Sequence, residues 1–497
     1  MTNKESIKKS FVNTGIVGGS QLVNIVFTVA KTKAIAILLG PAGVGLIQLF
    51  TSILTLLQNI FSFGLGFSSV REISQNHADN NSEKLNITIV SLNKWVWFTG
   101  ILGSLLIIIF SKNISFLTFG SDVYWQEVCL LSIALIFSNL AASKLAIIRG
   151  FRNMGDFARA SILNSLFGLI ISLPIYYLLR DRGIIMVIII TSIFTFLTNY
   201  FFSKKINLSK TYISLKESLI HGFSMVKLGL FMVLATFLSQ ASLHFIRVYI
   251  GDELGLNYVG YFAVGTTLTV TYMELIFSSM AADYFPKLSA INANDKLINK
   301  AVLDQTKIVV FLGIPLILFM YTFSEFIIIF LYSKDFIMAQ TLLILMLAGV
   351  FIRLIGFPIG YVFLAKNKSN MFILVQAIWN ISFILITLLL WPHLPGLTAV
   401  GISFIISYAL SVIVNIVLLK KLTNFNYDRN TKKNILLFLL LISLYLVVSY
   451  LFSGVYIVII KLVGLVLISY YCFRSLENLL EIDFILKIKQ IITTNKE

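Results

Sequence analysis

Five charged side chains in long apolar stretches of the sequence are candidates for binding or coupling: the cations Lys31, Lys33, Arg247 and Arg353, and the acid Glu274. A cation at bilayer depth costs at least about 2.5–3.5 kcal/mol on insertion scales, so it usually faces a bundle interior, pairs with a charge, or lines a wet pathway. Arg can hold a diphosphate through its bidentate fork, and Lys through a mobile point charge. Snorkelling to the outer headgroups is the alternative for Lys31, Lys33 and Arg247, whereas Arg353 lies too deep for it. The cations therefore predict a site that attracts a diphosphate.

Glu274 is the main acidic candidate. It lies about sixteen residues into its apolar stretch, near mid-membrane at the ~1.5 Å rise of a helix. A carboxyl group at that depth is a candidate proton carrier, linked electrostatically to Arg353 or Arg247 when it is ionised. A static ion pair with one of the intramembrane cations is the alternative. Lys461, in the middle of the last apolar stretch, is expected to contact lipid headgroups or a neighbouring helix.

Uncharged polar side chains share these apolar stretches. Amides and aromatic rings bind sugars, so the set suits an oligosaccharide, while hydrogen bonds between helices, worth about 0.6 kcal/mol on average, are the structural alternative. The set comprises Asn24, Gln48, Gln58, Asn59, Gln240, Tyr261, Tyr272 and Gln376. The four histidines have no carboxylate or Cys at metal-ligand spacing, and the motifs GxxxxGKS/T and HExxH are missing from the sequence. We expect no cofactor, no metal, no ATP site and no enzymatic activity.

The composition predicts the fold class. Of the 497 residues, 58% are hydrophobic and 12% are charged, with a mean hydropathy of +0.91, whereas soluble domains hold about 45–50% apolar and about 25% charged residues. A soluble enzyme is excluded, and an all-α polytopic membrane protein is predicted. The net charge of +17 would suggest nucleic acid in a soluble chain. Here Lys and Arg cluster in alternate loops, so no nucleic acid is expected.

Apolar windows bounded by charged or turn residues predict about 14 transmembrane helices. The first six lie at Phe11–Leu39, Val44–Ser68, Leu92–Phe110, Trp125–Ile148, Phe157–Leu179 and Gly183–Phe202. The other eight lie at Phe223–Ile250, Tyr258–Ala282, Ile308–Leu331, Met338–Ala365, Met371–Trp391, Leu397–Leu419, Ile435–Leu451 and Val455–Phe473. We expect a six-helix N-lobe over 1–205, a six-helix C-lobe over 206–422, two further helices over 423–473, and a cytoplasmic amphipathic tail over 474–497.

The distribution of basic residues orients these helices. With the N-terminus in the cytoplasm, 30 of the 39 Lys and Arg residues fall on the cytoplasmic side, which agrees with the positive-inside rule. An even number of crossings then places both termini in the cytoplasm. The outer loops are expected at Gly40–Gly43, Lys112–Tyr124, Gly251–Asn257 and Trp391–Gly396.

The sequence contains a weak internal repeat. The segment Val44–Ser74 can be laid without gaps on Val259–Ser289, which puts Asn59 opposite Glu274. This pairs helices one and two with helices seven and eight. A six-helix repeat is what a rocking transporter with two halves requires, with its site between the halves near the membrane midplane.

Four short motifs resemble those of a known family. They are KTKAIAILLGPAGVG at Lys31–Gly45, GLGFSSVREIS at Gly64–Ser74, IRGFR at Ile148–Arg152 and YFPKLS at Tyr284–Ser289. Together with the helix count and loop sizes, they resemble the O-antigen and related polysaccharide flippases of the multidrug/oligosaccharidyl-lipid/polysaccharide exporter superfamily. The resemblance implies two six-helix lobes around a cationic central cavity, lined by helices one, two, seven and eight.

The same resemblance implies a function. The chain would move an undecaprenyl-diphosphate-linked oligosaccharide across the bacterial inner membrane by ion-coupled alternating access, with a proton or sodium as the coupling ion. A polysaccharide polymerase and a chain-length regulator would be its protein partners, and the lipid bilayer its surroundings. A multidrug exporter of the same superfamily is the alternative, but it usually lacks helices thirteen and fourteen and needs no phosphate-attracting cations. A membrane-embedded polymerase or acyltransferase commonly carries a large outer loop or a His/Asp pair, and neither is predicted here.

Overall fold

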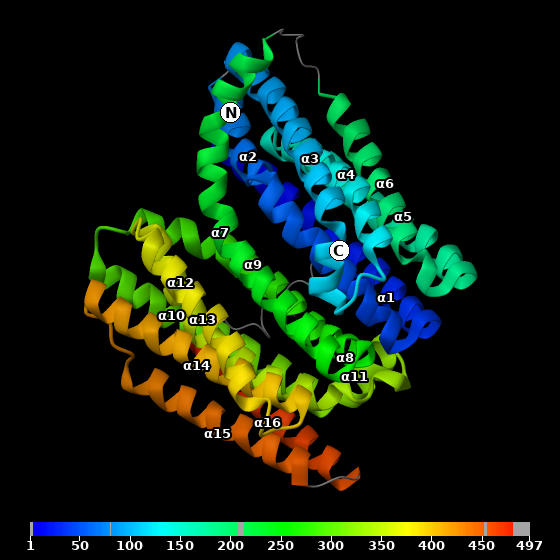
Figure 1. Cartoon of the computed structure of the whole chain (residues 1–497). Coiled ribbons are helices and arrows are strands. Elements are labelled where there is room, and N and C mark those ends of the chain that lie inside the picture. Colours follow the sequence, from blue (N-terminus) through cyan, green and yellow to red (C-terminus); the bar gives the residue numbers. More distant parts are fainter. Residues whose placement is uncertain (1–2, 80, 207–212, 452–454, 481–497) are drawn as a thin grey trace, which may run out of the picture. The chain divides into compact units, whose positions relative to one another are not determined.

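The structure is a computed structural model that describes residues 3–79, 81–206, 213–451 and 455–480. Every regular element in this described part is helical, as the composition predicted. The elements as far as the seventh helix are α1 (Asn3–Ser62), α2 (Leu65–Ala78), α3 (Ser82–Phe119), α4 (Trp125–Gly150), α5 (Met154–Leu179), the 3₁₀ turn η1 (Arg180–Gly183), α6 (Ile184–Lys204) and α7 (Leu215–Leu254) (Figure 1). The later elements are α8 (Leu256–Thr266), the π turn η2 (Thr267–Thr271), α9 (Tyr272–Ala290), α10 (Asp295–Thr322), α11 (Ser324–Leu331), the 3₁₀ turn η3 (Lys334–Phe336), α12 (Ala339–Ala365), α13 (Ser369–Leu390), α14 (Gly396–Thr423), α15 (Arg429–Leu451) and α16 (Val455–Leu480).

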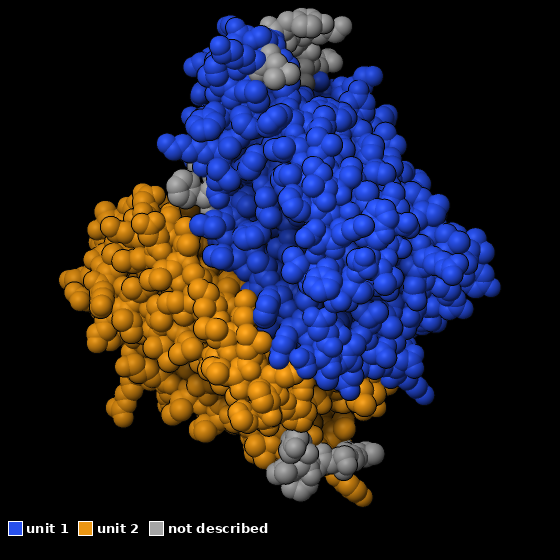
Figure 2. All heavy atoms as spheres, in the orientation of Figure 1, with its two compact units in different colours: residues 1–263, 330–336 blue, residues 264–329, 337–497 orange. Residues whose placement is uncertain are grey.

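The helices form two compact units (Figure 2). Unit 1 comprises residues 1–263 and 330–336, and unit 2 comprises residues 264–329 and 337–497. In unit 1, α4 packs against α3 and α6, and α5 packs against α1 and α6. In unit 2, α14 packs against α12 and α13, and α10 contacts α12 and α16. The boundary at residues 263 and 264 falls inside α8, so a continuous helix leads from unit 1 into unit 2.

Eleven segments of the described chain are long and apolar enough to cross a membrane. Two of them, Gly18–Ser62 with 45 residues and Met154–Lys204 with 51, far exceed the ~20 residues that one crossing needs. The first turns at Gly40, whose φ is 65°, and the second turns at η1. Each therefore has length for two crossings. With α8 to α9 as a further crossing interrupted by η2, the fold accommodates the predicted 14 crossings.

Several predicted boundaries were wrong. Helix α3 does not end near Phe110 but continues to Phe119, where Gly120 with a φ of 67° ends it, so most of the expected outer loop after Lys112 is helical. The expected outer loop at 251–257 shrinks to Gly255, which has a φ of 88°. Both ends are set by left-handed glycine conformations, which hydropathy does not report. Of the expected tail over 474–497, residues 481–497 lie outside the described part of the chain.

The predicted second helix is also interrupted, because α7 approaches the backbone there. Gly64 has a φ of 68° and separates α1 from α2. A Cβ on Gly64 would lie 2.3 Å from the carbonyl oxygen of Gly229 on α7, and a Cβ on Gly229 would lie 2.2 Å from the carbonyl oxygen of Phe63. A Cβ on Gly66, which lies in α2 just after the break, would be 3.9 Å from its nearest neighbour. Two glycines thus allow backbone to touch backbone, which breaks the helix that the apolar run favoured.

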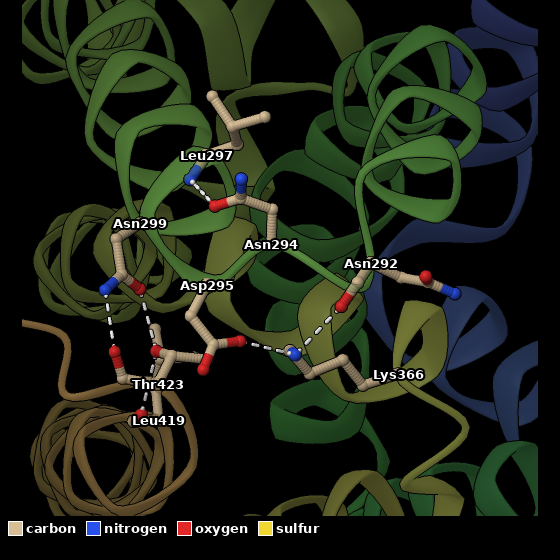
Figure 3. Close-up of polar contacts among 8 residues, drawn as sticks. All are labelled: Asn292, Asn294, Asp295, Leu297, Asn299, Lys366, Leu419 and Thr423. Carbon is tan, nitrogen blue, oxygen red and sulfur yellow. Dashed lines mark hydrogen bonds and ion pairs between the residues drawn. The ribbon is translucent and has the colours of Figure 1, made fainter.

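Polar contacts fasten the start of α10 to the ends of α12 and α14 (Figure 3). The ammonium of Lys366 donates to the carbonyl oxygen of Asn292 at 2.9 Å and pairs with Asp295 at 2.7 Å. The amide of Asn299 donates to the carbonyl oxygen of Thr423 at 2.8 Å, and the Thr423 hydroxyl donates to Oδ1 of Asn299 at 2.7 Å. These bonds satisfy carbonyl groups that helix ends leave free.

Asp428 begins α15 and connects it to α10. Its Oδ1 accepts the backbone N–H of Thr431 at 3.2 Å, as an N-cap does, and its Oδ2 pairs with Lys307 at 3.3 Å. Both contacts favour the ionised carboxylate. Within unit 2, the start of α15 is therefore joined to α10 by a charged cap as well as by direct helix packing.

Candidate substrate site

A cavity of about 220 Å³ lies within unit 2, lined by residues of α9, α12, α13 and α14. Arg353 reaches it from α12, and Glu274 reaches it from α9. The guanidinium donates from Nη2 to Oε2 of Glu274, so the two side chains form an ion pair. The side chain of Arg353 is 22% exposed and that of Glu274 is 54% exposed. The structure thus brings together two of the charged residues that the sequence singled out, with the acid as the more accessible partner.

Irregular features of both helices position this ion pair. The π turn η2 ends directly before α9, and Glu274 lies in the first turn of α9. On α12, Gly356 and Gly360 line the cavity, so no side chain fills the space one and two turns beyond Arg353. The guanidinium also lies 4.6 Å from the ring centre of Phe277, which is a cation–π contact.

Aromatic rings and small polar groups line the rest of the unit 2 cavity. They comprise the rings of Phe357, Tyr361, Phe372 and Tyr408, and the polar side chains of Gln376, Ser411 and Asn415. Asn415 is 6% exposed, and its Oδ1 has no hydrogen-bond partner among the described residues. A buried acceptor without a partner costs about 1–3 kcal/mol. The cavity therefore has an apolar wall, one ion pair and one unsatisfied amide.

A second cavity, of about 390 Å³, lies within unit 1 and is lined by residues of α1, α4 and α5. It contains the cations Lys31 and Arg149, and no Asp or Glu is among its lining residues in the described part of the chain. The Nζ of Lys31 stands 3.7 Å from the position of a Cβ on Gly168, so the missing side chain there leaves room for the ammonium. Arg149 lies over the ring of Phe157 at 4.6 Å. This cavity is suited to an anion.

Two further predicted cations belong to unit 1. Arg247 is 7% exposed, its Cζ lies 5.9 Å from the ring centre of Phe262, and its Nε has no hydrogen-bond partner in the described residues. One turn earlier, Nδ1 of His244 lies 2.7 Å from the hydroxyl of Ser52, which links α7 to α1. Lys33 is partly buried. The burial of Arg247 does not fit a side chain that snorkels to headgroups.

The predicted uncharged polar residues are partly or largely buried. Asn24 is 9% exposed and donates from Nδ2 to the hydroxyl of Ser161 at 2.7 Å, which joins α1 to α5. The partly buried members are Gln48, Gln58, Asn59, Gln240, Tyr261, Tyr272 and Gln376. Tyr272 and Gln376 belong to unit 2 and the others to unit 1. Asn24 was expected either to bind sugar or to form a hydrogen bond between helices. The structure contains the hydrogen bond between helices.

Residues that the sequence analysis did not select complete both cavities. Arg149, which lines the unit 1 cavity, lies inside the motif IRGFR. For the residues that line the unit 2 cavity, the signal in the sequence was their helical spacing. Arg353, Phe357 and Tyr361 follow one another at i, i+4 and i+8, and Tyr408, Ser411 and Asn415 at i, i+3 and i+7. In the described chain, no three His, Cys, Asp or Glu side chains are grouped so as to hold a metal ion.

Comparisons with known proteins agree with this architecture. The lipid III flippase of Escherichia coli (strain K12) is 22% identical over 363 residues, which cover 72% of this chain and 85% of that protein. The lipid III flippase of Shigella flexneri aligns with the same identity and coverage. The solved structure of the lipid II flippase MurJ in an inward closed conformation has a TM-score of 0.71 at 16% identity, covering 95% of this chain and 100% of that one.

A second solved structure has the same fold. An inward-facing multidrug resistance MATE family transporter of the MOP superfamily has a TM-score of 0.68 at 16% identity, covering 82% of this chain and 96% of that one. The sequence profile described as "Polysaccharide biosynthesis protein" matches residues 34–340, which is more than half of the chain. The chain therefore belongs to the polysaccharide biosynthesis protein family, and its polytopic fold is that of the MurJ and MATE structures.

Proposed function

We propose that the chain is a flippase that moves an undecaprenyl-diphosphate-linked oligosaccharide, an O-antigen or related polysaccharide unit, between the leaflets of the membrane. The family match and the similarity to proteins named lipid II and lipid III flippases support this proposal. The observation that carries it is the unit 1 cavity, where partly buried Lys31 and exposed Arg149 have no carboxylate among the described lining residues. Because a cation partly withdrawn from water without a counter-charge is costly, an anionic ligand is the natural complement of Lys31, and a diphosphate supplies that charge.

The predicted cations act in this proposal as ligands of the diphosphate. Lys31, Lys33, Arg247 and Arg353 attract the two phosphate groups, and Arg149 joins Lys31 in the unit 1 cavity. Charge-assisted hydrogen bonds make such contacts about twice as strong as neutral ones. The sugars meet the uncharged polar residues, which are Asn24, Gln48, Gln58, Asn59 and Tyr272.

The ion pair of unit 2 suggests how transport is coupled to an ion. An ionised Glu274 and a diphosphate compete for the same guanidinium of Arg353. Protonation of Glu274 from the periplasm releases Arg353 to the substrate, and loss of that proton to the cytoplasm restores the pair. A ligand shifts a conformational equilibrium only when it binds one state better, and this competition provides such a difference. Sodium is the alternative coupling ion.

The proposal places the chain in a bacterial inner membrane with both termini in the cytoplasm, as the basic residues indicate. The N-lobe over 1–205 and the C-lobe over 206–422 are its moving parts, while residues 423–473 and the tail over 474–497 lie outside that core. A polysaccharide polymerase and a chain-length regulator receive the translocated unit. Single-cysteine labelling from the periplasmic side tests this topology, and labelling at position 430 contradicts it.

Reconstitution tests the transport step. Wild-type protein in proteoliposomes should move extracted lipid-linked oligosaccharide to the opposite leaflet, and an imposed pH gradient should accelerate it. Glu274→Gln should retain substrate binding but lose the response to the gradient, because the neutral amide cannot release a proton. An unchanged response assigns the coupling to sodium or another carboxylate, and no movement by the wild type refutes the flippase proposal.

The second candidate is a multidrug exporter, favoured by the MATE fold and by the aromatic wall and carboxylate of the unit 2 cavity. Aromatic rings and a carboxylate suit an organic cation. Arg353 opposes it, because a guanidinium in the same cavity repels such a ligand. Cells that produce the chain should then gain no resistance to cationic dyes, and a resistance that depends on Glu274 would support the exporter instead.

A further inference from the structure

We propose that the unit 2 cavity is a carbohydrate subsite that holds one sugar ring of the substrate, next to the position where Arg353 contacts the diphosphate. The inference rests on the proposed function. It adds that the part of the substrate recognised by this cavity is a sugar ring. The cavity is formed within unit 2 alone.

The size of the cavity suits a single ring. Its volume is about 220 Å³, which is below the ~300–1,000 Å³ of pockets that take drug-sized ligands. A whole oligosaccharide or a polyprenyl chain does not fit. One pyranose ring is a compact ligand with an apolar C–H face and a rim of hydroxyl groups, and the cavity offers both kinds of surface.

The lining chemistry distinguishes a sugar from other small ligands. The rings of Tyr361, Phe372 and Tyr408 line the cavity and give an apolar wall for the C–H face. The ion pair of Arg353 and Glu274 offers donors and acceptors of opposite charge with no net charge. While the ion pair is closed, a free diphosphate inside the cavity would meet the carboxylate, and an organic cation would meet the guanidinium. Neutral hydroxyl groups can bond to both.

Asn415 provides an independent indication of a ligand. Its side chain lines the cavity, it is 6% exposed, and its Oδ1 has no partner among the described residues. Native proteins rarely leave a buried amide oxygen without a hydrogen bond. A sugar hydroxyl that donates to this oxygen would satisfy it. Gln376 lines the same cavity from α13 and offers a second amide.

Glycine at position 360 keeps the cavity open and supplies the test. A Cβ there would meet only Cε2 of Phe372, at 3.9 Å. The side chain of Gly360→Leu would therefore occupy space inside the cavity without forcing the helix backbone to move. Asn415→Ala removes the unsatisfied acceptor, which leaves no new unpaired group. Gly19→Leu is the matched control, because Gly19 on α1 is exposed and nothing lies within 4 Å of its Cβ position.

Saturation-transfer NMR on the full chain in nanodiscs measures binding directly. The probes are the methyl glycosides of glucose, galactose, N-acetylglucosamine and rhamnose, with inorganic pyrophosphate as a competitor. We expect signal from at least one glycoside, a loss of at least ~tenfold in its affinity in Gly360→Leu and Asn415→Ala, and no loss in Gly19→Leu. No signal from any glycoside, or equal signal in wild type and Gly360→Leu, overturns the inference. Displacement of the glycoside by pyrophosphate in wild type, with pyrophosphate binding lost in Gly360→Leu, assigns the cavity to the diphosphate and also overturns it.

Transport separates this inference from the proposed function. If the wild type moves lipid-linked oligosaccharide in proteoliposomes and Gly360→Leu moves it equally well, the subsite is refuted and the flippase stands. If the wild type moves none but glycoside binding depends on the glycine at position 360, the flippase is refuted and the subsite stands.

Discussion

Replacing Lys31 by Met separates a binding role for this cation from a structural one. Lys31 stands in the unit 1 cavity, beside Gly168 and with no carboxylate among the described lining residues. An ammonium partly withdrawn from water without a counter-charge carries a desolvation cost, which an apolar side chain of similar length does not. We therefore expect the thermal unfolding midpoint of the detergent-solubilised Lys31→Met protein to stay level or to rise. Differential scanning fluorimetry measures it.

Substrate binding should change in the opposite direction. A hydrogen bond to a charged group contributes about 1.5–3 kcal/mol, and each ~1.4 kcal/mol is a factor of about ten. Lys31→Met should therefore bind the lipid-linked oligosaccharide about 10- to 150-fold more weakly, measured at equilibrium in nanodiscs. Surface polysaccharide should fall in cells in which the variant is the only copy.

Lys461→Met is the matched control for this pair of measurements. Lys461 is also a partly buried lysine in a membrane-spanning helix, α16, but it lines neither cavity. Its variant should keep both the unfolding midpoint and the affinity. A midpoint that falls by several degrees in Lys31→Met, or an affinity that does not change, would refute the reasoning, because the cation would then stabilise the bundle rather than bind an anion.

Three further experiments test other parts of the structure. Arg353→Ala should reduce surface polysaccharide at normal expression, and Arg353→Lys should restore only part of it, since an ammonium cannot make a bidentate contact; equal restoration contradicts this. Gly229→Ala should lower the unfolding midpoint by several degrees, because its Cβ would lie 2.2 Å from a backbone oxygen, whereas Gly66→Ala, with 3.9 Å to the nearest atom, should not. Desolvation raises the pKa of Asp428, but its hydrogen bonds and the charge of Lys307 outweigh this and leave the pKa below its usual range. The ionised carboxylate of Asp428 therefore stabilises the fold above the unfolded-state pKa of about 3.9, and this stabilisation is lost as the pH falls through the lower folded-state pKa. The thermal unfolding midpoints of wild type and Asp428→Asn should thus converge below pH ~4.

The membrane helices were predictable because each one must bury about 20 apolar residues. Hydropathy located the described apolar segments from Gly18 to Leu480. It failed where a glycine decides the backbone. The break at Gly64 depends on a contact with Gly229, which is remote in the sequence, and the end of α3 depends on the left-handed conformation of Gly120. Neither feature changes the local hydropathy.

The charged candidates were found because a charge in an apolar stretch is rare, and this signal is independent of the fold. This signal identified Arg353 and Glu274, and Arg353 was one of the two residues expected to interact with the acid. The structure contains this ion pair. The signal missed Arg149, which lies at the end of its helix and so looked like an ordinary cytoplasmic charge. It did not show that Asn415 shares the unit 2 cavity with the ion pair, because one polar residue on an apolar helix face is usually explained by a hydrogen bond.

The π turn η2 has a mechanical consequence for the pair that follows it. A π turn holds one residue more than an α turn, so it rotates everything after Thr271 by about 100° relative to an uninterrupted helix. The gap-free overlay that put Asn59 opposite Glu274 does not allow for this rotation. If the five residues of η2 rewound as α-helix, the carboxylate would turn through more than a quarter of a circle away from Arg353 while the helices on both sides stayed intact. Closure of the ion pair therefore depends on the π turn, because only the wider turn directs the carboxylate of Glu274 toward Arg353.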